Sequence, residues 1–322
     1  MSKAAKIWLI IAVCLTLIGI AVVALSIALG GSDMFIVKKT DKKTVTVPLT
    51  GRFRDIGIDS QTEDIRFVLT DDGSCRVVFE EPETAEFSAA IANGTLEIRA
   101  GQTDRWYERL VLFNFSDPKI TVFLPQAEYG SLNIKESTGD ILLPGELRFD
   151  GIGITVSTGD IDCASSVRER LRLKTSTGDI LVRDLTAGSL DLAVSTGKVE
   201  VRSVRCGKAE ISVTTGKAVL SEVVCTELTS DGSTGSITLE DVTASGTVSI
   251  TRSTGDVKFA RSDAAELTVE TGTGDVSGSL LSPKVFLTKS GTGRIRVPDT
   301  ASGGTCRITT GTGDISIMIT EK

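Results

Sequence analysis

The sequence predicts an all-β protein that folds as a single-stranded β-solenoid, a parallel β-helix that we expect to be right-handed. Three observations predict it: a corner of the S-T-G-D type that occurs ten times, a constant spacing between its copies, and alternating apolar residues between them. Successive corner glycines are 19 or 20 residues apart, which is typical of stacked rungs rather than of separate globular domains. The ten corner glycines are Gly139, Gly159, Gly178, Gly197, Gly216, Gly235, Gly255, Gly274, Gly293 and Gly313.

The first predicted element is an apolar segment at residues 7–29, which contains no charged side chain. A helix of this length would extend roughly 35 Å, against about 30 Å for the hydrocarbon core of a membrane. We therefore predict a transmembrane helix at residues 7–29, a short cytoplasmic N-terminus at residues 1–6 and a spacer at residues 30–43. A cleaved signal peptide is the alternative, but the apolar run is long for one and no convincing A-x-A cleavage site follows it.

The lysines near this segment bear on its orientation. Lys3 and Lys6 precede it, whereas four lysines between Lys38 and Lys43 follow it, so a bare count of positive charges favours an internal body. Long domains, however, cross the membrane largely regardless of charge. We therefore expect a cytoplasmic N-terminus and an external solenoid.

Residues 44–322 form the predicted solenoid in two parts. Residues 44–133 contain short alternating apolar runs but no settled corner, and we interpret them as irregular first turns. Residues 134–322 form the regular rungs, in which the second and fourth residues after a corner glycine are apolar, as at Val199 and Val201. This alternation is typical of a strand with one buried face.

The composition excludes several functions. The formal net charge is −7, so we expect no nucleic-acid partner, because phosphate binding needs clustered Lys and Arg. There is no histidine, which excludes an imidazole general base, a histidine-dependent nucleophile and a histidine-ligated zinc ion. The constant rung length leaves no long loops to wall a cleft, so we expect neither an enzyme nor a cofactor.

An aspartate follows several of the corner glycines, and stacked carboxylates attract divalent cations such as Ca²⁺. The column is interrupted at Lys198, Lys217, Ser236 and Arg294, and the sequence lacks the nine-residue period of calcium-binding β-rolls. We therefore favour capping of the turn by the aspartate side chains and keep calcium as the weaker alternative. The candidate residues are Asp140, Asp160, Asp179, Asp256 and Asp275.

Cys206 and Cys225 are 19 residues apart, and each lies nine residues after a corner glycine. They should stack on adjacent rungs, close enough for a disulfide bond in principle. Other rungs have alanine at this position, as at Ala244 and Ala264, so we interpret it as a small buried position. The cysteines have no C-x-x-C spacing, which argues against a disulfide framework or a zinc site.

Residues 101–115 break the repeat because they carry four aromatic side chains. Aromatic residues in a loop can contact a partner. We favour the interpretation that they cover the membrane-proximal end of the solenoid core and keep contact with a partner as the alternative. These residues are Trp106, Tyr107, Phe113 and Phe115.

The chain resembles the DUF4097 family of adhesin-like domains, which is related to the head-GIN adhesin domains. The resemblance rests on Ile120–Pro125 (I-T-V-F-L-P), on Leu132–Ile141 (L-N-I-K-E-S-T-G-D-I) and on the repeated S-T-G-D-I and S-T-G-K-V corners. It covers most of residues 44–322. The resemblance implies a β-solenoid of the bacterial envelope behind a single membrane span, and it transfers no catalytic residue.

We therefore predict a single-pass protein of the bacterial cell membrane whose external solenoid is a non-catalytic, adhesin-like or structural binding module. The expected partners, besides the membrane, are an envelope protein, a cell-wall glycan, or a second copy of the chain. Self-association would use the C-terminal rung, because Ile315–Thr320 would leave open strand edges. The alternatives are an envelope-stress sensor or regulator that acts through a membrane partner and, more distantly, a glycan-active β-helix enzyme.

Overall fold

The computed structural model describes residues 12–21, 43–81, 85–102 and 118–320. The chain divides into two compact units, one of residues 43–102 with 117–322 and the other of residues 1–42 with 103–116. In the latter unit, residues 12–21 form a helix. The rest of the predicted span at residues 7–29 lies outside the described part, and no helix among the described residues is long and apolar enough to cross a membrane.

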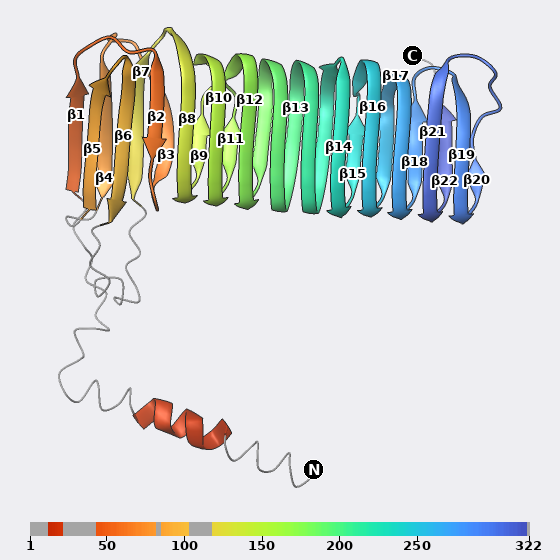
Figure 1. The fold of residues 1–322 in the computed structure, drawn as a ribbon, viewed down its shortest axis with the longest axis horizontal. Coiled ribbons are helices and arrows are strands. Elements are labelled where there is room, and N and C mark those ends of the chain that lie inside the picture. Colours follow the sequence, from red (N-terminus) through yellow and green to blue (C-terminus); the bar gives the residue numbers. More distant parts are fainter. Residues whose placement is uncertain (1–11, 22–42, 82–84, 103–117, 321–322) are drawn as a thin grey trace. The chain divides into compact units, whose positions relative to one another are not determined.

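The unit of residues 43–102 and 117–322 confirms the predicted all-β solenoid. Its described residues contain 22 strands that join in one hydrogen-bonded sheet (Figure 1). In chain order the strands are β1 (Lys43–Leu49), β2 (Asp55–Asp59), β3 (Asp64–Thr70), β4 (Cys75–Glu81), β5 (Ala85–Ala92), β6 (Thr95–Gln102), β7 (Lys119–Pro125), β8 (Glu128–Thr138), β9 (Ile141–Leu143), β10 (Arg148–Thr158), β11 (Ile161–Cys163), β12 (Ser166–Thr177), β13 (Ile180–Cys225), β14 (Glu227–Thr234), β15 (Ile237–Glu240), β16 (Thr243–Thr254), β17 (Val257–Thr273), β18 (Val276–Leu280), β19 (Lys284–Thr292), β20 (Ile295–Arg296), β21 (Gly304–Thr312) and β22 (Ile315–Ile319).

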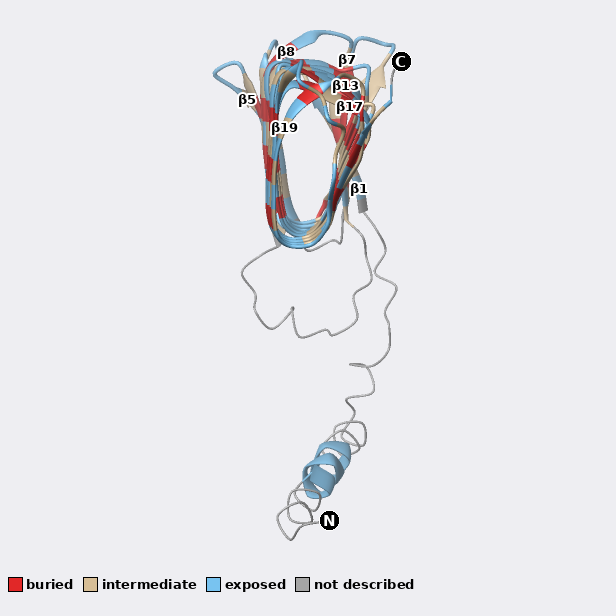
Figure 2. Cartoon of the chain, turned by 90° about the vertical axis from the view of Figure 1, so that its right-hand side faces the viewer, coloured by how far each residue is buried: buried red, intermediate tan, exposed pale blue. Residues whose placement is uncertain are grey.

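Each regular rung has two walls that meet at the corner glycine. We call the strand before the glycine, such as β10, the long wall, and the strand after it, such as β11, the short wall. Strands of one wall pair in parallel from rung to rung: Ile161 of β11 pairs with Ile141 of β9 and with Ile180 of β13. Seen along the stack, the walls enclose a narrow oval, and buried residues lie along both of them (Figure 2).

The rungs at the two ends do not stack in chain order. At the N-terminal end β2 pairs with both β6 and β8, and β3 pairs with both β7 and β9, so the first rung lies between the second and the third. At the other end β21 pairs with both β17 and β19, and β22 pairs with both β18 and β20. The last rung of the sequence therefore lies inside the stack. The expectation that Ile315–Thr320 forms the open end is wrong, because the outermost rung is β19–β20.

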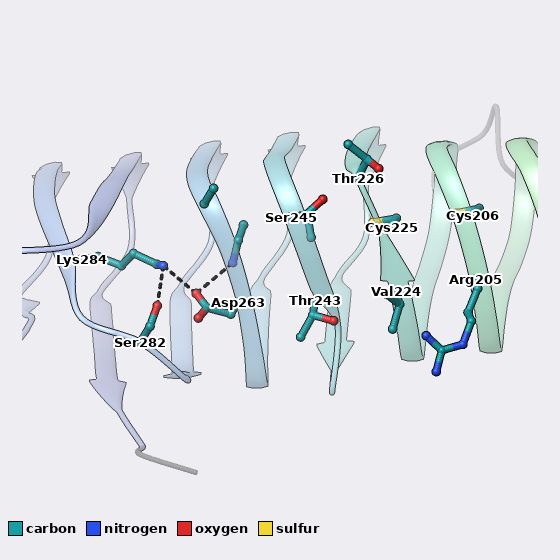
Figure 3. A pocket seen from close by; sticks show the side chains of 13 residues that line it. Arg205, Cys206, Val224, Cys225, Thr226, Thr243, Ser245, Asp263, Ser282 and Lys284 are labelled. Atoms are coloured by element: carbon teal, nitrogen blue, oxygen red, sulfur yellow. Dashed lines mark hydrogen bonds and ion pairs between the residues drawn. The ribbon is translucent and has the colours of Figure 1, made fainter.

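This outermost rung, β19–β20, is called the distal end below, and a buried ion pair fastens it. Nζ of Lys284 on β19 lies 2.7 Å from Oδ1 of Asp263 on β17 and 2.7 Å from Oγ of Ser282 (Figure 3). Because β21 lies between β19 and β17, the pair bridges the inserted strand. Only 3% of Lys284 is exposed, so the ammonium depends on these partners.

The two ends of the stack are closed differently. At the N-terminal end β4 runs antiparallel to β1 and β7, β5 runs antiparallel to β6, and Cα atoms of β1 and β5 come within 8 Å of each other. Phe87 of β5 stacks on Phe79 of β4 with ring centroids 4.5 Å apart. At the distal end no described strand pairs with the outer edge of β19 or β20, and 43% of Ile295 is exposed. The stack is thus capped at one end and open at the other.

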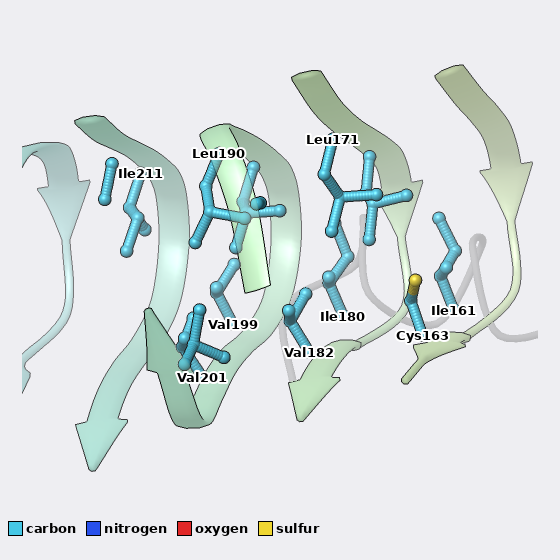
Figure 4. Packing of buried hydrophobic residues seen from close by; sticks show 14 of the residues in the cluster. Ile161, Cys163, Leu171, Ile180, Val182, Leu190, Val199, Val201 and Ile211 are labelled. Carbon is cyan, nitrogen blue, oxygen red and sulfur yellow. The ribbon is translucent and has the colours of Figure 1, made fainter. Parts of the chain in front are cut away.

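The core is one continuous cluster of mainly aliphatic side chains between the walls (Figure 4). The residues two and four positions after a corner glycine point into it, as the alternation predicts: Ile180, Val182, Val199 and Val201 are all buried. Each such side chain stabilises the fold by roughly 1.5–3 kcal/mol through its removal from water. Because each regular rung repeats these positions, stabilisation is spread along the stack.

Candidate functional site

The corner glycines are explained by the closeness of successive rungs. All ten have φ between 133° and 155°, a backbone conformation that residues with a β-carbon rarely adopt. The amide of one corner glycine donates to the carbonyl oxygen of the threonine before the next, as from Gly139 to Thr158 at 3.0 Å. A β-carbon at Gly216 would overlap the carbonyl oxygen of Gly197. The corner therefore serves the stacking of the backbone.

The corner aspartates also connect one rung to the next. Oδ1 of Asp140 accepts the backbone N–H of Asp160 at 2.8 Å, and Oδ1 of Asp160 accepts that of Asp179 at 2.7 Å. Among the described residues, no group of three or more His, Cys, Asp or Glu side chains is placed to hold a metal ion. We assign these carboxylates to capping and propose no calcium site. The same bond to the next rung is made by all five candidates, Asp140, Asp160, Asp179, Asp256 and Asp275.

A second corner, which the sequence analysis missed, lies six residues after the glycine. Asp184, Ser203, Glu222, Asp241 and Arg261 all have a left-handed backbone, with φ between 48° and 55°. Four of these side chains join neighbouring rungs: Ser203 donates to Glu222 at 2.7 Å, and Arg261 donates to Asp241 at 2.5 Å. Because the residue types differ, only the constant distance from the glycine could have revealed this corner.

Two buried carboxylates lie close together in the rungs near the N-terminal end. Glu136 of β8 accepts the hydroxyl of Ser60 and, at 3.0 Å, the backbone N–H of Ser137. Glu63 accepts the backbone N–H of Gln61 at 2.8 Å. Burial raises the pKa of Glu136 to about 7, against the opposing effect of the Ser60 hydrogen bond, and the nearby carboxylate of Glu63 adds to the rise. Glu136 therefore titrates near neutral pH inside the stack.

Arg252 is a buried cation at an inward position of β16, and 3% of it is exposed. Nη2 donates to Oγ of Ser230 at 2.8 Å and Nη1 donates to the carbonyl oxygen of Thr251 at 3.0 Å. The absence of a side chain at Gly232 makes room, because a β-carbon there would lie 2.6 Å from Nη1 of Arg252. Burial lowers the pKa of Arg252. Ser230 and Gly232 thus accommodate a side chain from the next rung.

A groove of about 580 Å³ runs across several rungs on the edge that joins a short wall to the next long wall (Figure 3). Small side chains nine residues after the corner glycine line it, among them Cys225, Ala244 and Ala264. Arg205 and Lys284 lie at its opposite ends. The groove is the candidate site, because it offers a continuous surface along the stack.

Cys206 and Cys225 both line this groove and are free thiols. Burial raises the pKa of Cys206 to about 12, with a further contribution from Cys225, and burial raises the pKa of Cys225 to about 11. The thiolate is the reactive form of cysteine, so both thiols are poor nucleophiles at neutral pH. Their place on the floor of the groove is structural.

The remaining site prediction cannot be placed on this surface. The aromatic residues Trp106, Tyr107, Phe113 and Phe115 lie outside the described residues. Both interpretations of these side chains, cover of the solenoid core and contact with a partner, stay predictions.

Comparison of the sequence with known families decides the relationship. The family model Toastrack DUF4097 matches residues 53–222 and 205–322. This chain belongs to the DUF4097 (Toastrack) family. No curated protein sequence matches this Toastrack chain.

Solved structures resemble this Toastrack chain at low sequence identity. A "Putative lipid binding protein" from Parabacteroides distasonis superposes with a TM-score of 0.51 and 16% identity, over 74% of this chain and 97% of its own length. That likeness shows the fold alone. A "putative adhesin" from the same organism has a TM-score of 0.49 and 12% identity, over 74% of this chain and 98% of its own. A "putative adhesin" from Parabacteroides merdae has a TM-score of 0.48 and 12% identity, over 74% and 97%.

The chemistry of the groove in this Toastrack chain is that of a contact surface. Thr226, Thr243, Ser245 and Ser282 bring hydroxyl groups to it. The charge of Lys284 is balanced by Asp263 within the groove. Such a surface can hydrogen-bond an extended ligand laid along the rungs, and the small side chains on its floor let the ligand approach the backbone.

Proposed function

We propose that this Toastrack chain is a membrane-anchored, non-catalytic, adhesin-like binding module of the bacterial envelope. The groove carries the proposal. It crosses several rungs, so its length suits an extended polymer rather than a compact small molecule. Its hydroxyl groups suit a polyhydroxylated ligand, so the ligand class we propose is a cell-wall glycan.

The non-catalytic part of the proposal is supported by where the unusual acids and bases lie. Glu136 is the described carboxyl whose pKa is raised to about 7, but it lies near the N-terminal end of the stack and does not line the groove. In the groove, Lys284 is held by Asp263. A general acid or base needs a pKa near neutral pH and access to a substrate: Glu136 has the pKa but lies away from the groove, and Cys206 and Cys225 line the groove but have pKa values of about 12 and about 11.

The anchoring part of the proposal rests on the sequence. Residues 7–29 contain no charge and are long enough for a membrane span. With the N-terminus in the cytoplasm, residues 30–42 would link the span to β1, and the solenoid would be displayed outside the cytoplasm.

Binding to isolated cell walls tests this proposal. The full chain, purified in mild detergent, should sediment with the walls in a saturable manner. A bulky side chain in the groove, Ser245→Trp, should weaken this binding at least tenfold. The matched control is Ser212→Trp, because Ser212 is also an exposed serine and does not line the groove.

Each outcome of this experiment is decisive for one part of the proposal. Failure of the unsubstituted chain to sediment with walls would overturn the glycan-binding function. Equal binding by both tryptophan variants would leave a binding module but remove the groove as its site.

A further inference from the structure

The exposed apolar side chains of the solenoid gather at the distal end. Val224 is the one large apolar side chain of the described solenoid that is exposed elsewhere. The others, with their exposed fractions, are Val285 (36%), Leu287 (45%), Ile295 (43%) and Met318 (59%), all on β19, β20 or the adjoining β22. Apolar side chains concentrated on one end of a stack indicate a surface that is covered in the functional state.

The distal end also has unpaired backbone groups. Among the described strands, β19 pairs with β21 and β20 pairs with β22, so no described strand pairs with the outer edge of either; at the start of β19 the hydroxyl of Thr300 donates to the carbonyl oxygen of Lys284. A lipid surface could cover the apolar side chains but could not pair with the backbone N–H and C=O groups. A β-strand can do both, because it continues the sheet at an open edge.

A second copy of the chain supplies such a strand. Because the two ends of the stack differ, they determine which end of the second copy can pair with β19. The N-terminal end is closed by antiparallel strands that approach each other, so it is a poor surface for stacking head to tail. The open distal end can instead pair with the distal end of another copy. An interface between identical surfaces gives a closed dimer and not a filament.

The sequence of β19 is self-complementary in this arrangement. If two copies of β19 run antiparallel with Leu287 opposite Leu287 of the second copy, Phe286 lies opposite Thr288 and Val285 lies opposite Lys289. The register follows from counting along β19, Lys284–Thr292. Leu287 meets an apolar side chain, and Lys289 faces Val285 rather than another lysine, so no like charges are directly opposed.

We propose that the distal end is a homodimer interface in which β19 pairs antiparallel with β19 of a second copy about a two-fold axis at Leu287. The dimer would cover the inward side chains Phe286 and Ile295 at the open end, bring Leu287 against Leu287 of the second copy, and satisfy the backbone groups of β19. This inference goes beyond the proposed glycan binding and does not depend on the groove.

Sedimentation of the full chain in detergent tests the proposal. The unsubstituted chain should sediment as a dimer at micromolar concentration. Leu287→Lys should raise the dissociation constant at least tenfold, because it places two ammonium groups at the two-fold axis. Val224→Lys is the matched control, since Val224 is similarly exposed but is separated from β19 by the rungs of β16, β17 and β21, and it should leave the dimer intact.

A cross-linking variant keeps the test decisive if Leu287→Lys alters the fold. Leu287→Cys should form a covalent dimer on mild oxidation, and Val224→Cys should not. A monomeric unsubstituted chain, a ladder of higher oligomers, or a dimer that survives Leu287→Lys would overturn the proposal. So would equal cross-linking by the two cysteine variants.

Discussion

At the scale of single residues, each corner glycine meets two requirements, one from the backbone conformation of the turn and one from the close stacking of the rungs. A positive φ is available to glycine at low cost, but the corner also brings the next backbone so close that no side chain fits between rungs. Both the backbone conformation and the lack of space for a β-carbon therefore require glycine at this position. It is the reason that the glycine is constant while the residue after it varies among Asp, Lys, Ser and Arg.

Gly216→Ala should destabilise the solenoid by about 3 kcal/mol, because the new β-carbon is strained by its φ and overlaps the carbonyl oxygen of Gly197. Denaturant unfolding measures this loss. Gly57→Ala is the matched control: no atom lies within 4 Å of the added β-carbon, and its φ is ordinary. A control variant that loses as much stability as Gly216→Ala would refute the explanation.

Glu136 predicts how stability depends on pH. Its pKa in the folded chain is about 7, above the ordinary value of 4.5, so between these values the folded state holds a proton that the unfolded state has lost. Stability should therefore fall as pH rises from 4.5 to 7, by up to about 3 kcal/mol.

Glu136→Gln keeps the size of the side chain but cannot ionise. Thermal unfolding between pH 4.5 and 7 should show a flatter pH profile for this variant than for the unsubstituted chain. An unchanged slope would assign the dependence to other groups.

The glycine columns and inward apolar residues could be predicted because each repeats with the period of the rung. The buried polar residues could not. Among the described residues, a buried arginine occurs at only one inward position, Arg252. Ser230 and Gly232 on the preceding rung give its side chain a hydrogen-bond partner and space, but in the sequence each of them looks like a residue that weakens the core. Because this arrangement of residues on two rungs occurs once, it leaves no periodic pattern in the sequence.

At the scale of elements, the order of the rungs is the main difference from the sequence prediction. Every regular rung has nearly the same pattern, so any rung can stack on any other in the same register, and local sequence does not fix the order. At each end of the stack, two rungs are exchanged relative to their order in the chain. The first and the last rung of the sequence therefore each lie between two neighbouring rungs. Lys284 and Asp263 are the side chains that mark the exchange, because they join β19 to β17 across β21.

Lys284→Met should therefore loosen the distal rungs. Removing one partner of a buried ion pair typically costs 3–5 kcal/mol, and we expect a loss of about 3 kcal/mol because Asp263 is partly exposed. Hydrogen exchange followed by mass spectrometry should show faster exchange in β19 to β22 than in β10 to β12.

Lys208→Met is the control, since Lys208 makes an exposed ion pair with Glu210 at 2.7 Å. Exposed pairs of this kind contribute little to stability, because water screens the two charges. Faster exchange spread evenly over all rungs of Lys284→Met would contradict a local role for the ion pair.

The candidate groove could be predicted only in part at this scale. The sequence shows that small residues recur nine positions after the corner glycine. These positions form the floor of a groove because of how the chain bends on the edge that joins a short wall to the next long wall. The second corner lies on this edge, and its residue types vary from Asp to Arg, so the sequence gives no constant residue to mark the bend.

At the scale of the whole molecule, the solenoid has one capped end, one open end and a groove that crosses several of its rungs. This division suits the proposed binding module, which would make one contact in the groove and another at the distal end. The proposed glycan binding depends on the solenoid being outside the cytoplasm, because a cell-wall glycan is available only there.

Labelling of Ser212→Cys in intact cells tests this location most directly. Ser212 is exposed, whereas Cys206 and Cys225 have raised pKa values and should react slowly, so the unsubstituted chain serves as the control. A maleimide that cannot cross the cytoplasmic membrane should label the variant in intact cells and the control far less. Labelling that appears only after the cells are lysed would place the solenoid in the cytoplasm and contradict the account.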